Sequence, residues 1–244
     1  TTGATRVVVG LGGSAVNDAG AGLLAALGAT SAGGPLDRGP AGLATLTSVR
    51  LDAARARFEG VELVLASDVD NPLLGITGAT KIYGPQKGLP EERLVTVDGW
   101  LQHLADLTDR KVAGQKGAGA AGGIGFALML LGGTRESGVV LVAEAVDLGA
   151  KVGAADLVVT GEGAFDFSSR SGKVPYGVAL IAAENLVPCI ALAGQVLVGS
   201  REMRALGVES AYSLVDLVGE ERALGAPAEA LADLASRTAR TWSR

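Results

Sequence analysis

Short β-branched runs that end in glycine-rich turns constrain the fold of this chain most strongly. One run covers residues 6–11 and leads into Gly12-Gly13-Ser14, and another covers residues 61–66 and leads into Asp68-Val69-Asp70-Asn71. A short apolar run bounded by turn residues is typical of a buried strand. Glycine supplies 37 of the 244 residues without a three-residue period, which excludes a collagen and indicates many tight turns.

Strand and helix patterns alternate along the chain. Residues 156–160, 174–186 and 187–193 form a strand, a helix and a strand, and such a unit implies parallel strands with a right-handed crossover. The alternation predicts an α/β fold. Further strands are expected at 139–142 and 210–215, and further helices at 90–110, 227–242 and 14–27, the last with Ser14 as N-cap and Gly28 just past its end.

The scarce residue types and the charge exclude several classes of function. The single Cys189 excludes an internal disulfide and a cysteine-rich metal site, and its apolar neighbours predict a buried position. The single His103 excludes a zinc site with several histidines, and it lies off the apolar stripe of its helix, which predicts a solvated surface position. The net charge of -5, without a basic cluster, argues against a nucleic-acid partner.

Two sequence signals bear on the membrane. No apolar run reaches the length that a membrane-spanning helix needs, and no signal peptide opens the chain. We therefore expect a cytoplasmic protein without a membrane partner.

Two nucleotide-binding motifs match only in part. Residues 10–15 fit the G-x-G-x-x-G/A dinucleotide fingerprint, but Asp37, the nearest acid at the required distance, lies in a loop. Residues 117–122 fit the same pattern without a strand before them. A P-loop fails because Phe167 stands where its first glycine should be, and because Val174 follows Lys173.

Three predicted strand ends combine glycine with acidic or amide side chains. They are Gly12-Gly13-Ser14 with Asn17-Asp18, Asp68 to Asn71, and residues 160–163 with Asp166. In open α/β sheets, ligands bind outside the carboxyl ends of the strands, where glycine lets backbone N–H groups approach an anion. Carboxylates there can hold Mg²⁺ or accept a proton, and the lysines of the nearby loops, Lys87 and Lys173, can neutralise phosphate charge. The set predicts phosphoryl transfer. For each motif alone, a helix cap or an Asx-turn is an equal alternative.

Five segments together resemble the bacterial type I glycerate kinases. They are GLGGSAVND at 10–18, DVDNPL at 68–73, YGPQKG at 83–88, GAGAAGG at 117–123, and TGEG at 160–163 with Asp166 and GKVP at 172–175. The resemblance implies ATP- and Mg²⁺-dependent phosphorylation of D-glycerate to 2- or 3-phosphoglycerate. It also implies two α/β domains, one of them flavodoxin-like with parallel strands, and an active site in the cleft between them. It leaves a homo-oligomer open.

The chain departs from the family pattern in a few places. Val16 stands where the family usually has threonine, and Ala19 where it usually has glycine. Phe167-Ser168-Ser169 replaces a usual Gln-Thr or Gln-Ser pair, so Ser168 or Ser169 would supply the hydroxyl. Family members also carry a longer N-terminal part with two further motifs. We therefore expect a central α/β domain at 1–155, and at 156–244 the C-terminal part of a flavodoxin-like domain without its N-terminal strands.

The resemblance and the strand-end chemistry together assign candidate roles. We expect catalysis to depend on two acids and two lysines: Asp68, Asp166, Lys87 and Lys173. Metal ligands stay unassigned, as does the division of roles between the acids. Two alternatives stay open: a nicotinamide-dependent oxidoreductase built on Gly10, Gly12 and Ala15, and a non-catalytic fragment of the kinase. The residues expected to bind substrate or nucleotide are Gly12, Gly13, Ser14, Asn17, Asp18, Asn71, Gly161, Glu162, Gly163 and Ser168.

Overall fold

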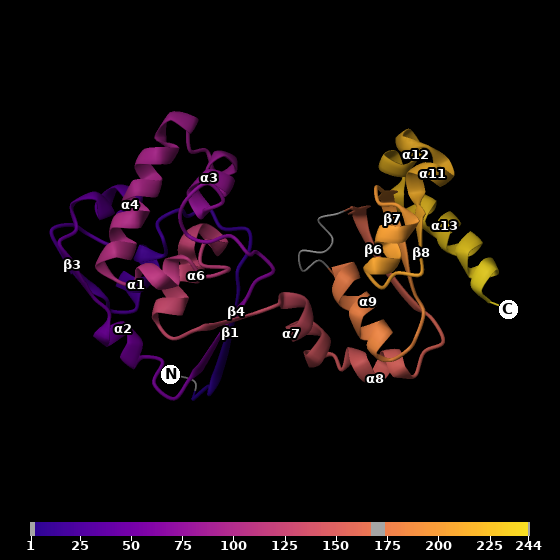
Figure 1. Ribbon diagram of the computed structural model, residues 1–244, viewed down its shortest axis with the longest axis horizontal. Helices are drawn as coiled ribbons and strands as arrows, with labels where there is room; N and C mark the ends of the chain where they lie inside the picture. The colour runs from indigo at the N-terminus through magenta and orange to yellow at the C-terminus, as the bar shows by residue number, and fades with distance from the viewer. Residues whose placement is uncertain (1–2, 167–173, 244) are drawn as a thin grey trace. The chain divides into compact units, whose positions relative to one another are not determined.

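The computed structural model describes residues 3–166 and 174–243, which form two compact units. The first unit is Thr1–Gly138 and the second is Val139–Arg244 (Figure 1). Each unit is an α/β body with its own parallel sheet, as the sequence predicts.

The first unit is built on a three-stranded parallel sheet. The strands are β1 (Arg6–Gly10), β4 (Glu62–Ala66) and β5 (Thr134–Glu136), in the order β1-β4-β5. Gly10 pairs with Ala66, and Ala66 pairs with Glu136. The carboxyl ends of all three strands therefore lie at one edge of the sheet, where the loops that follow them come together.

Helices and a small hairpin complete the core of the first unit. Helix α6 packs against β4 and contacts α1 and α3. Buried leucines of α4 confirm the predicted apolar stripe, since Leu101 and Leu104 are fully buried. The helices are α1 (Ala21–Ala26), α2 (Asp52–Ala56), α3 (Ala79–Tyr83), α4 (Leu94–Leu107), α5 (Arg110–Ala113) and α6 (Ala120–Leu130), and the hairpin joins β2 (Thr30–Ala32) to β3 (Ser48–Arg50).

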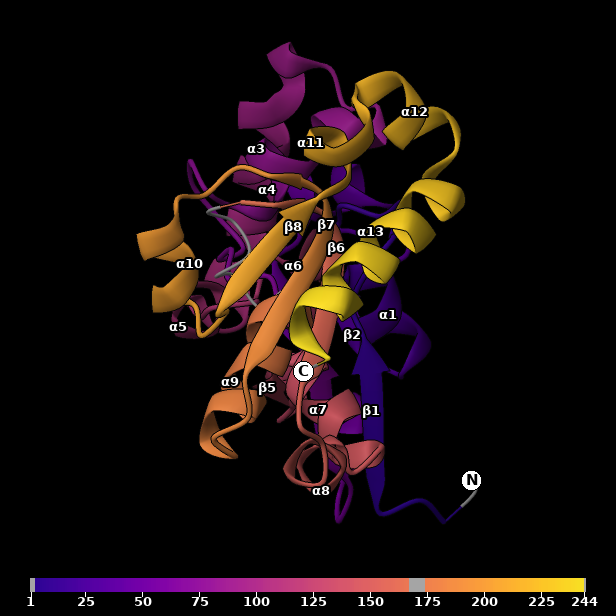
Figure 2. The same cartoon turned by 90° about the vertical axis from the view of Figure 1, so that its right-hand side faces the viewer.

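The second unit contains the predicted strand–helix–strand crossover. Strand β6 (Val158–Phe165), helix α9 (Val174–Glu184) and strand β7 (Cys189–Val196) follow one another, and β6 pairs with β7 in parallel. Strand β8 (Ser210–Ser213) extends the sheet beside β7, and Figure 2 shows the three strands side by side with α13 across them. The other helices are α7 (Gly138–Ala145), α8 (Leu148–Gly153), α10 (Ser200–Ala205), α11 (Leu214–Val218), α12 (Glu220–Gly225) and α13 (Pro227–Trp242).

The secondary-structure predictions for residues 139–142 and 14–20 are wrong. Residues 139–142 belong to helix α7 and not to a strand, because a short apolar run fits a buried helix as well as a strand. Residues 14–20 are not helical, since Ala19 and Gly20 have left-handed φ angles of 58° and 71° and delay the start of α1 to Ala21. The predicted end is confirmed, because Gly28 has a φ of 103° directly after the last helical turn.

Helices α7 and α8 belong to the second unit. Helix α8 packs on α9, and Val139 at the start of α7 lies against Gly177 of α9, where a Cβ would overlap it. These contacts place α7 and α8 with the second sheet.

Cys189 and His103 differ in how well the sequence anticipated them. Cys189 is 1% exposed, and burial raises the pKa of its thiol to about 11, which confirms an inert core position. His103 is partly exposed at the surface, as predicted, and its Nε2 lies 2.7 Å from the carbonyl oxygen of Leu46, a contact that the sequence did not indicate. The apolar stripe of α4 did not show that the turn before β3 packs beside it.

Every helix within residues 3–166 and 174–243 is too short or too polar to span a lipid bilayer.

Candidate functional site

A pocket of about 150 Å³ lies in the first unit, at the carboxyl edge of its sheet. The loop after β1 forms one wall and the turn at 83–87 another. Val69 closes it from the loop after β4, and the start of α6 forms its floor. The lining residues are Leu11, Gly12, Gly13, Ser14, Val69, Tyr83, Gln86, Lys87, Ala121 and Gly122.

Lys87 is the cation of this pocket. Its Nζ donates hydrogen bonds to Oγ of Ser14 at 3.0 Å and to the carbonyl oxygen of Val16 at 2.7 Å. An ammonium has three N–H donors, and these contacts use two of them. Burial lowers the pKa of Lys87, while the charge of Asp18 opposes that shift. The predicted lysine and the predicted Gly12-Gly13-Ser14 turn are thus brought together.

The loop after β1 has free space around the backbone of its glycines. Among the described residues, no atom would lie within 4 Å of a Cβ added at Gly12 or Gly13. Gly13 has a left-handed φ of 63°, which glycine adopts without strain. This backbone can therefore approach an anion closely, as the sequence predicts.

Asn17 and Asp18 have different surroundings. Asp18 is 8% exposed, and its two carboxylate oxygens accept hydrogen bonds from the backbone N–H groups of Gly20 (2.9 Å) and Gly22 (3.2 Å). This geometry gives Asp18 a capping role at the start of α1. Asn17 donates from Nδ2 to Oγ1 of Thr80 at 3.1 Å, and its buried Oδ1 has no hydrogen-bond partner within the described part of the chain. Asn17 therefore keeps an acceptor for a ligand.

Asn71 supports Tyr83. The Tyr83 hydroxyl donates to Oδ1 of Asn71 at 2.7 Å, and Nδ2 of Asn71 donates to the carbonyl oxygen of Thr77 at 2.7 Å. Burial raises the pKa of Tyr83, so its hydroxyl stays protonated at neutral pH. Asn71 thus positions a pocket-lining ring through both of its amide atoms.

Asp68 joins the ends of two neighbouring strands. Its Oδ1 accepts hydrogen bonds from Oγ of Ser137 at 2.8 Å and from the backbone N–H of Gly138 at 3.0 Å. Its Oδ2 has no hydrogen-bond partner in residues 3–166 and 174–243. Mg²⁺ is usually held by one or two carboxylates together with substrate phosphates, so one fixed carboxylate fits such an ion. No group of three or more His, Cys, Asp or Glu side chains that could hold a metal occurs among the described residues.

Beside Asp68 lies a charged cluster that the sequence did not reveal. Asp70 forms ion pairs with Nη2 of Arg135 at 2.7 Å and with Nζ of Lys116 at 3.0 Å. The hydrogen bond from Lys116 and the nearby Arg135 charge lower the pKa of Asp70, against an opposing effect of burial. Nε of Arg135 also donates to the carbonyl oxygen of Ser67 at 3.0 Å. The cluster therefore holds two cations and one anion next to the loop after β4.

The remaining predicted residues lie in the second unit. Gly161, Glu162 and Gly163 lie inside β6, which runs to Phe165, so the prediction of a strand end at 160 is wrong. A Cβ at Gly161 would overlap the carbonyl oxygen of Leu192, so close pairing with β7 explains this glycine. Asp166 follows the strand directly. Ser168 and Lys173 lie outside the described residues.

The structure does not place Asp37 where the dinucleotide interpretation needs an acid. Asp37 lies in the connection between β2 and the 3₁₀ turn Pro40–Thr45, with an exposed side chain beside Arg38. The strand that pairs with β1 is β4, and Asp37 is not at its end. Asp37 is therefore not where a dinucleotide-binding fold holds its ribose-binding acid.

Comparisons with known proteins bear on the family of this chain. The model of the glycerate kinase family matches residues 1–243. The chain is 39% identical over 221 residues to a glycerate kinase of Bacillus subtilis (strain 168), covering 87% of this chain and 58% of that protein. It is 38% identical over 226 residues to a glycerate 2-kinase of Escherichia coli (strain K12), covering 89% of this chain and 59% of that protein.

A solved structure assigned as a glycerate kinase 2 of Salmonella typhimurium LT2 superposes with a TM-score of 0.70 at 33% identity. It covers 98% of this chain and 66% of the Salmonella chain. The chain thus spans under two thirds of the length of these relatives. The family model covers nearly every residue, and so the chain belongs to the glycerate kinase family.

Proposed function

We propose that this chain supplies the phosphate-binding part of a type I glycerate kinase that transfers a phosphoryl group from ATP to D-glycerate. The observation that carries the proposal is the Lys87 ammonium held over the open Gly12-Gly13-Ser14 turn at the carboxyl edge of the sheet. The names of the relatives support the substrate, and either hydroxyl of glycerate fits the proposal.

The pocket would act on the phosphates by charge and by orientation. Phosphoryl transfer requires little covalent chemistry from the protein, and its catalysis is mainly positioning and stabilisation of negative charge. The N–H groups of Gly12 and Gly13 and the third N–H of Lys87 would contact phosphate oxygens. The half-buried ammonium interacts more strongly than an exposed one because less water screens it. The hydroxyl of Ser14, held by Lys87, would give the phosphate a further donor.

Asp68 and Asp166 stay the acid candidates. Asp68 is oriented through Oδ1, and its Oδ2 would hold Mg²⁺ or accept the proton of the attacking hydroxyl. Mg²⁺, when bound, neutralises charge on the phosphate oxygens. The expectation of a site in a cleft between two domains stays a prediction, as do the two domain ranges.

We assign the carboxylate of the acceptor to the cluster beside Asp68. Asp70 neutralises only one of the two cations, Lys116 and Arg135, so the cluster retains one positive charge. The guanidinium of Arg135 is fixed by Asp70 and Ser67, which reduces the entropy that binding would cost. A planar guanidinium suits a carboxylate because it can donate two parallel hydrogen bonds.

The test is an assay of ADP release with D-glycerate and MgATP, on the 244-residue chain and on a Lys87→Met variant. Loss of a preorganised cationic donor is expected to lower kcat about 100-fold. Lys111→Met is the matched control, because Lys111 is exposed and does not line the pocket. Equal turnover of the two variants would show that Lys87 has no part in phosphoryl transfer.

Turnover in this assay, together with ADP and NADH binding measured by fluorescence, separates the two open alternatives. Turnover of D-glycerate by the 244-residue chain would exclude a non-catalytic fragment. If the chain binds ADP through Lys87 but does not turn over D-glycerate, the phosphate site is supported and the kinase activity of this chain is not. Tight NADH binding with no ADP binding would favour the oxidoreductase.

A further inference from the structure

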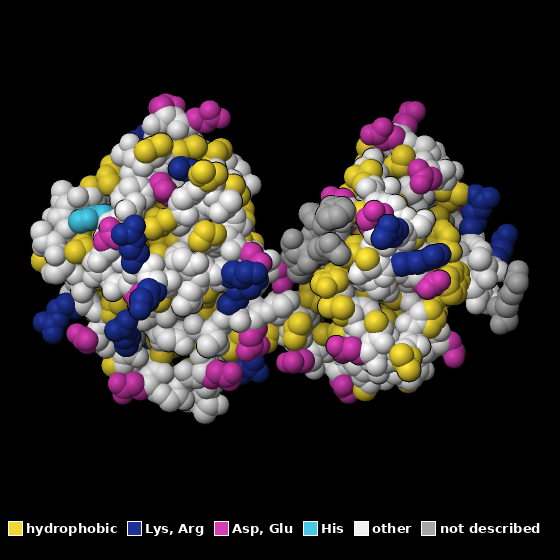
Figure 3. Space-filling view, in the orientation of Figure 1, with side chains coloured by type: hydrophobic (Ala, Val, Ile, Leu, Met, Phe, Trp, Pro, Cys, Tyr) yellow, Lys and Arg dark blue, Asp and Glu magenta, His cyan; other side chains and the backbone are white. Residues whose placement is uncertain are grey.

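A second pocket, of about 290 Å³, lies in the second unit among α11, α12 and α13. Three of its seven lining residues are arginines, and Figure 3 shows Lys and Arg side chains gathered over the α13 region. The pocket shares no residue with the pocket of Lys87. Its lining is Leu217, Val218, Arg222, Asp233, Ser236, Arg237 and Arg240.

The charges of this pocket do not cancel. Nη2 of Arg222 forms an ion pair with Oδ2 of Asp233 at 2.7 Å, which links α12 to α13. Arg237 and Arg240 have no ion-pair partner in the part of the chain that the structure describes. They are three residues apart on one helix, so their side chains are neighbours on one face. The pocket therefore carries an excess of two positive charges in a chain whose net charge is -5.

Stabilisation of the helix end explains only part of this arrangement. Cations are favourable near the C-terminus of a helix, but the effect falls off within the last turn. Arg240 lies in the last turn of α13, whereas Arg237 precedes it and Arg222 belongs to a different helix. The ion pair with Asp233 accounts for Arg222, so Arg237 is the arginine that needs another reason to line the pocket.

We propose that this pocket binds a phosphate dianion, either free or as a small phosphate monoester. Two unpaired guanidinium groups match a charge of -2, and each can donate two hydrogen bonds to phosphate oxygens. The hydroxyl of Ser236 supplies another donor. Asp233 stays on Arg222 and keeps that guanidinium in place.

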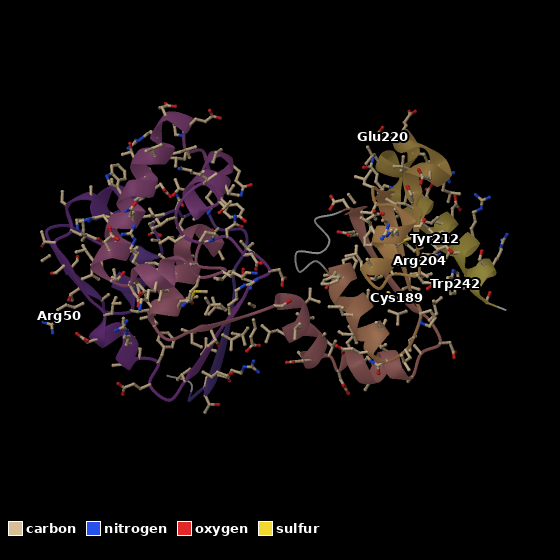
Figure 4. All side chains as sticks on the ribbon, in the orientation of Figure 1. Arg50, Cys189, Arg204, Tyr212, Glu220 and Trp242 are labelled. Carbon is tan, nitrogen blue, oxygen red and sulfur yellow. The ribbon has the colours of Figure 1, made fainter. Side chains whose placement is uncertain are left out.

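Trp242 provides a local signal for a binding test. Its Nε1 donates to the hydroxyl of Tyr212 at 2.9 Å, and it follows Arg240 by two residues (Figure 4). The only other tryptophan is Trp100. In a Trp100→Phe background, tryptophan emission therefore reports on the end of α13. Sodium phosphate is titrated against sodium chloride at constant ionic strength, with methyl phosphate as the monoester probe.

A saturable change in Trp242 emission with both phosphate probes is expected. Arg237→Gln with Arg240→Gln should weaken binding about 100-fold, because each of the two lost charged contacts is worth about one factor of ten. Arg201→Gln with Arg204→Gln is the matched control, since these exposed arginines are also three residues apart, on α10. The control should bind phosphate as the parent does.

Phosphate binding that is equal in the two double variants would overturn the proposal, and so would an equal response to chloride. Circular dichroism checks that each variant is folded. If the double variant unfolds, Arg237→Lys replaces it, which keeps the charge and removes the planar fork; unchanged affinity would then contradict a guanidinium site. Kinase activity is not measured, so the outcome does not depend on the proposed function.

Discussion

Two glycine-rich segments of the first unit have opposite surroundings. At the end of β1 and in the loop after it, a Cβ added at Gly10, Gly12 or Gly13 would meet no atom of the described residues within 4 Å. At the start of α6, a Cβ would overlap backbone oxygens: Pro72 at Gly119, Val16 at Gly122 and Gly117 at Gly125. The first segment is open, whereas the second is filled by other parts of the backbone.

The filled segment determines where the open one lies. Gly122 has a φ of 70° and lies against the carbonyl group of Val16. That same oxygen accepts a hydrogen bond from Lys87 at 2.7 Å. Glycine in the filled segment therefore acts through packing, and glycine in the open segment leaves room for a ligand. A count of glycines could not separate these causes.

Gly122→Ala tests the filled segment and should have the largest effect. The new methyl group would overlap the Val16 carbonyl, and alanine at this φ is also strained. Overpacking and strain together should lower the free energy of unfolding by about 4 kcal/mol. Urea denaturation followed by circular dichroism measures this loss. A loss below about 1 kcal/mol would show that the segment has room to relax.

Gly12→Ala tests the open segment and should affect binding more than stability. Gly12 has no left-handed φ and has open space around it, so the free energy of unfolding should change by less than about 0.5 kcal/mol. The methyl group would hold a phosphate away from the backbone, and ADP affinity should fall about tenfold. Calorimetric titration with ADP measures it, with Gly99→Ala on α4 as a control that also has space around it. Unchanged ADP affinity would remove the loop from the phosphate site.

Asp70→Asn tests whether ion pairs or backbone packing hold the filled segment. Asp70 pairs with Lys116, directly before Gly117, but its side chain is 58% exposed, so solvent screens the pair. The loss of stability at pH 7 should be under about 1 kcal/mol. The folded-state pKa of Asp70 lies below its ordinary value of 3.8. Its stabilisation is therefore present above pH 3.8 and is lost as the pH falls through the folded-state pKa.

Acid denaturation of the parent and of Asp70→Asn measures this difference, which should shrink as the pH falls through that range. A difference that stays constant down to the acid limit would show that the effect of Asp70→Asn does not come from its charge.

Strong local patterns predicted much of the fold. Residues 227–242 alternate apolar and polar faces, and α13 has the predicted bounds. The crossover from β6 through α9 to β7 follows from two short apolar runs around a helical pattern. The strand prediction for residues 139–142 was wrong because four consecutive apolar residues show no hydrophobic periodicity that separates a helix from a strand. The predicted start of α1 was wrong because the left-handed conformation of Ala19 depends on a backbone hydrogen bond to Gly122, which lies far along the chain.

The residues of the candidate site also fall into those that local patterns predicted and those that they did not. Gly12, Gly13 and Ser14 follow a clear strand, and Lys87 lies in a distinct turn, so the sequence could indicate them. Arg135 and Lys116 were missed, because their shared partner Asp70 is brought to them by the order β1-β4-β5. Side-chain contacts between segments this far apart leave no local pattern.

The central claim is that the open segment contacts phosphate and the filled segment does not. It is tested most directly by the backbone amide resonances of Gly12, Gly13, Gly119 and Gly125 during titration with ADP. We predict saturable shifts for Gly12 and Gly13 and almost none for Gly119 and Gly125. Binding of ADP that leaves Gly12 and Gly13 unshifted would contradict the claim.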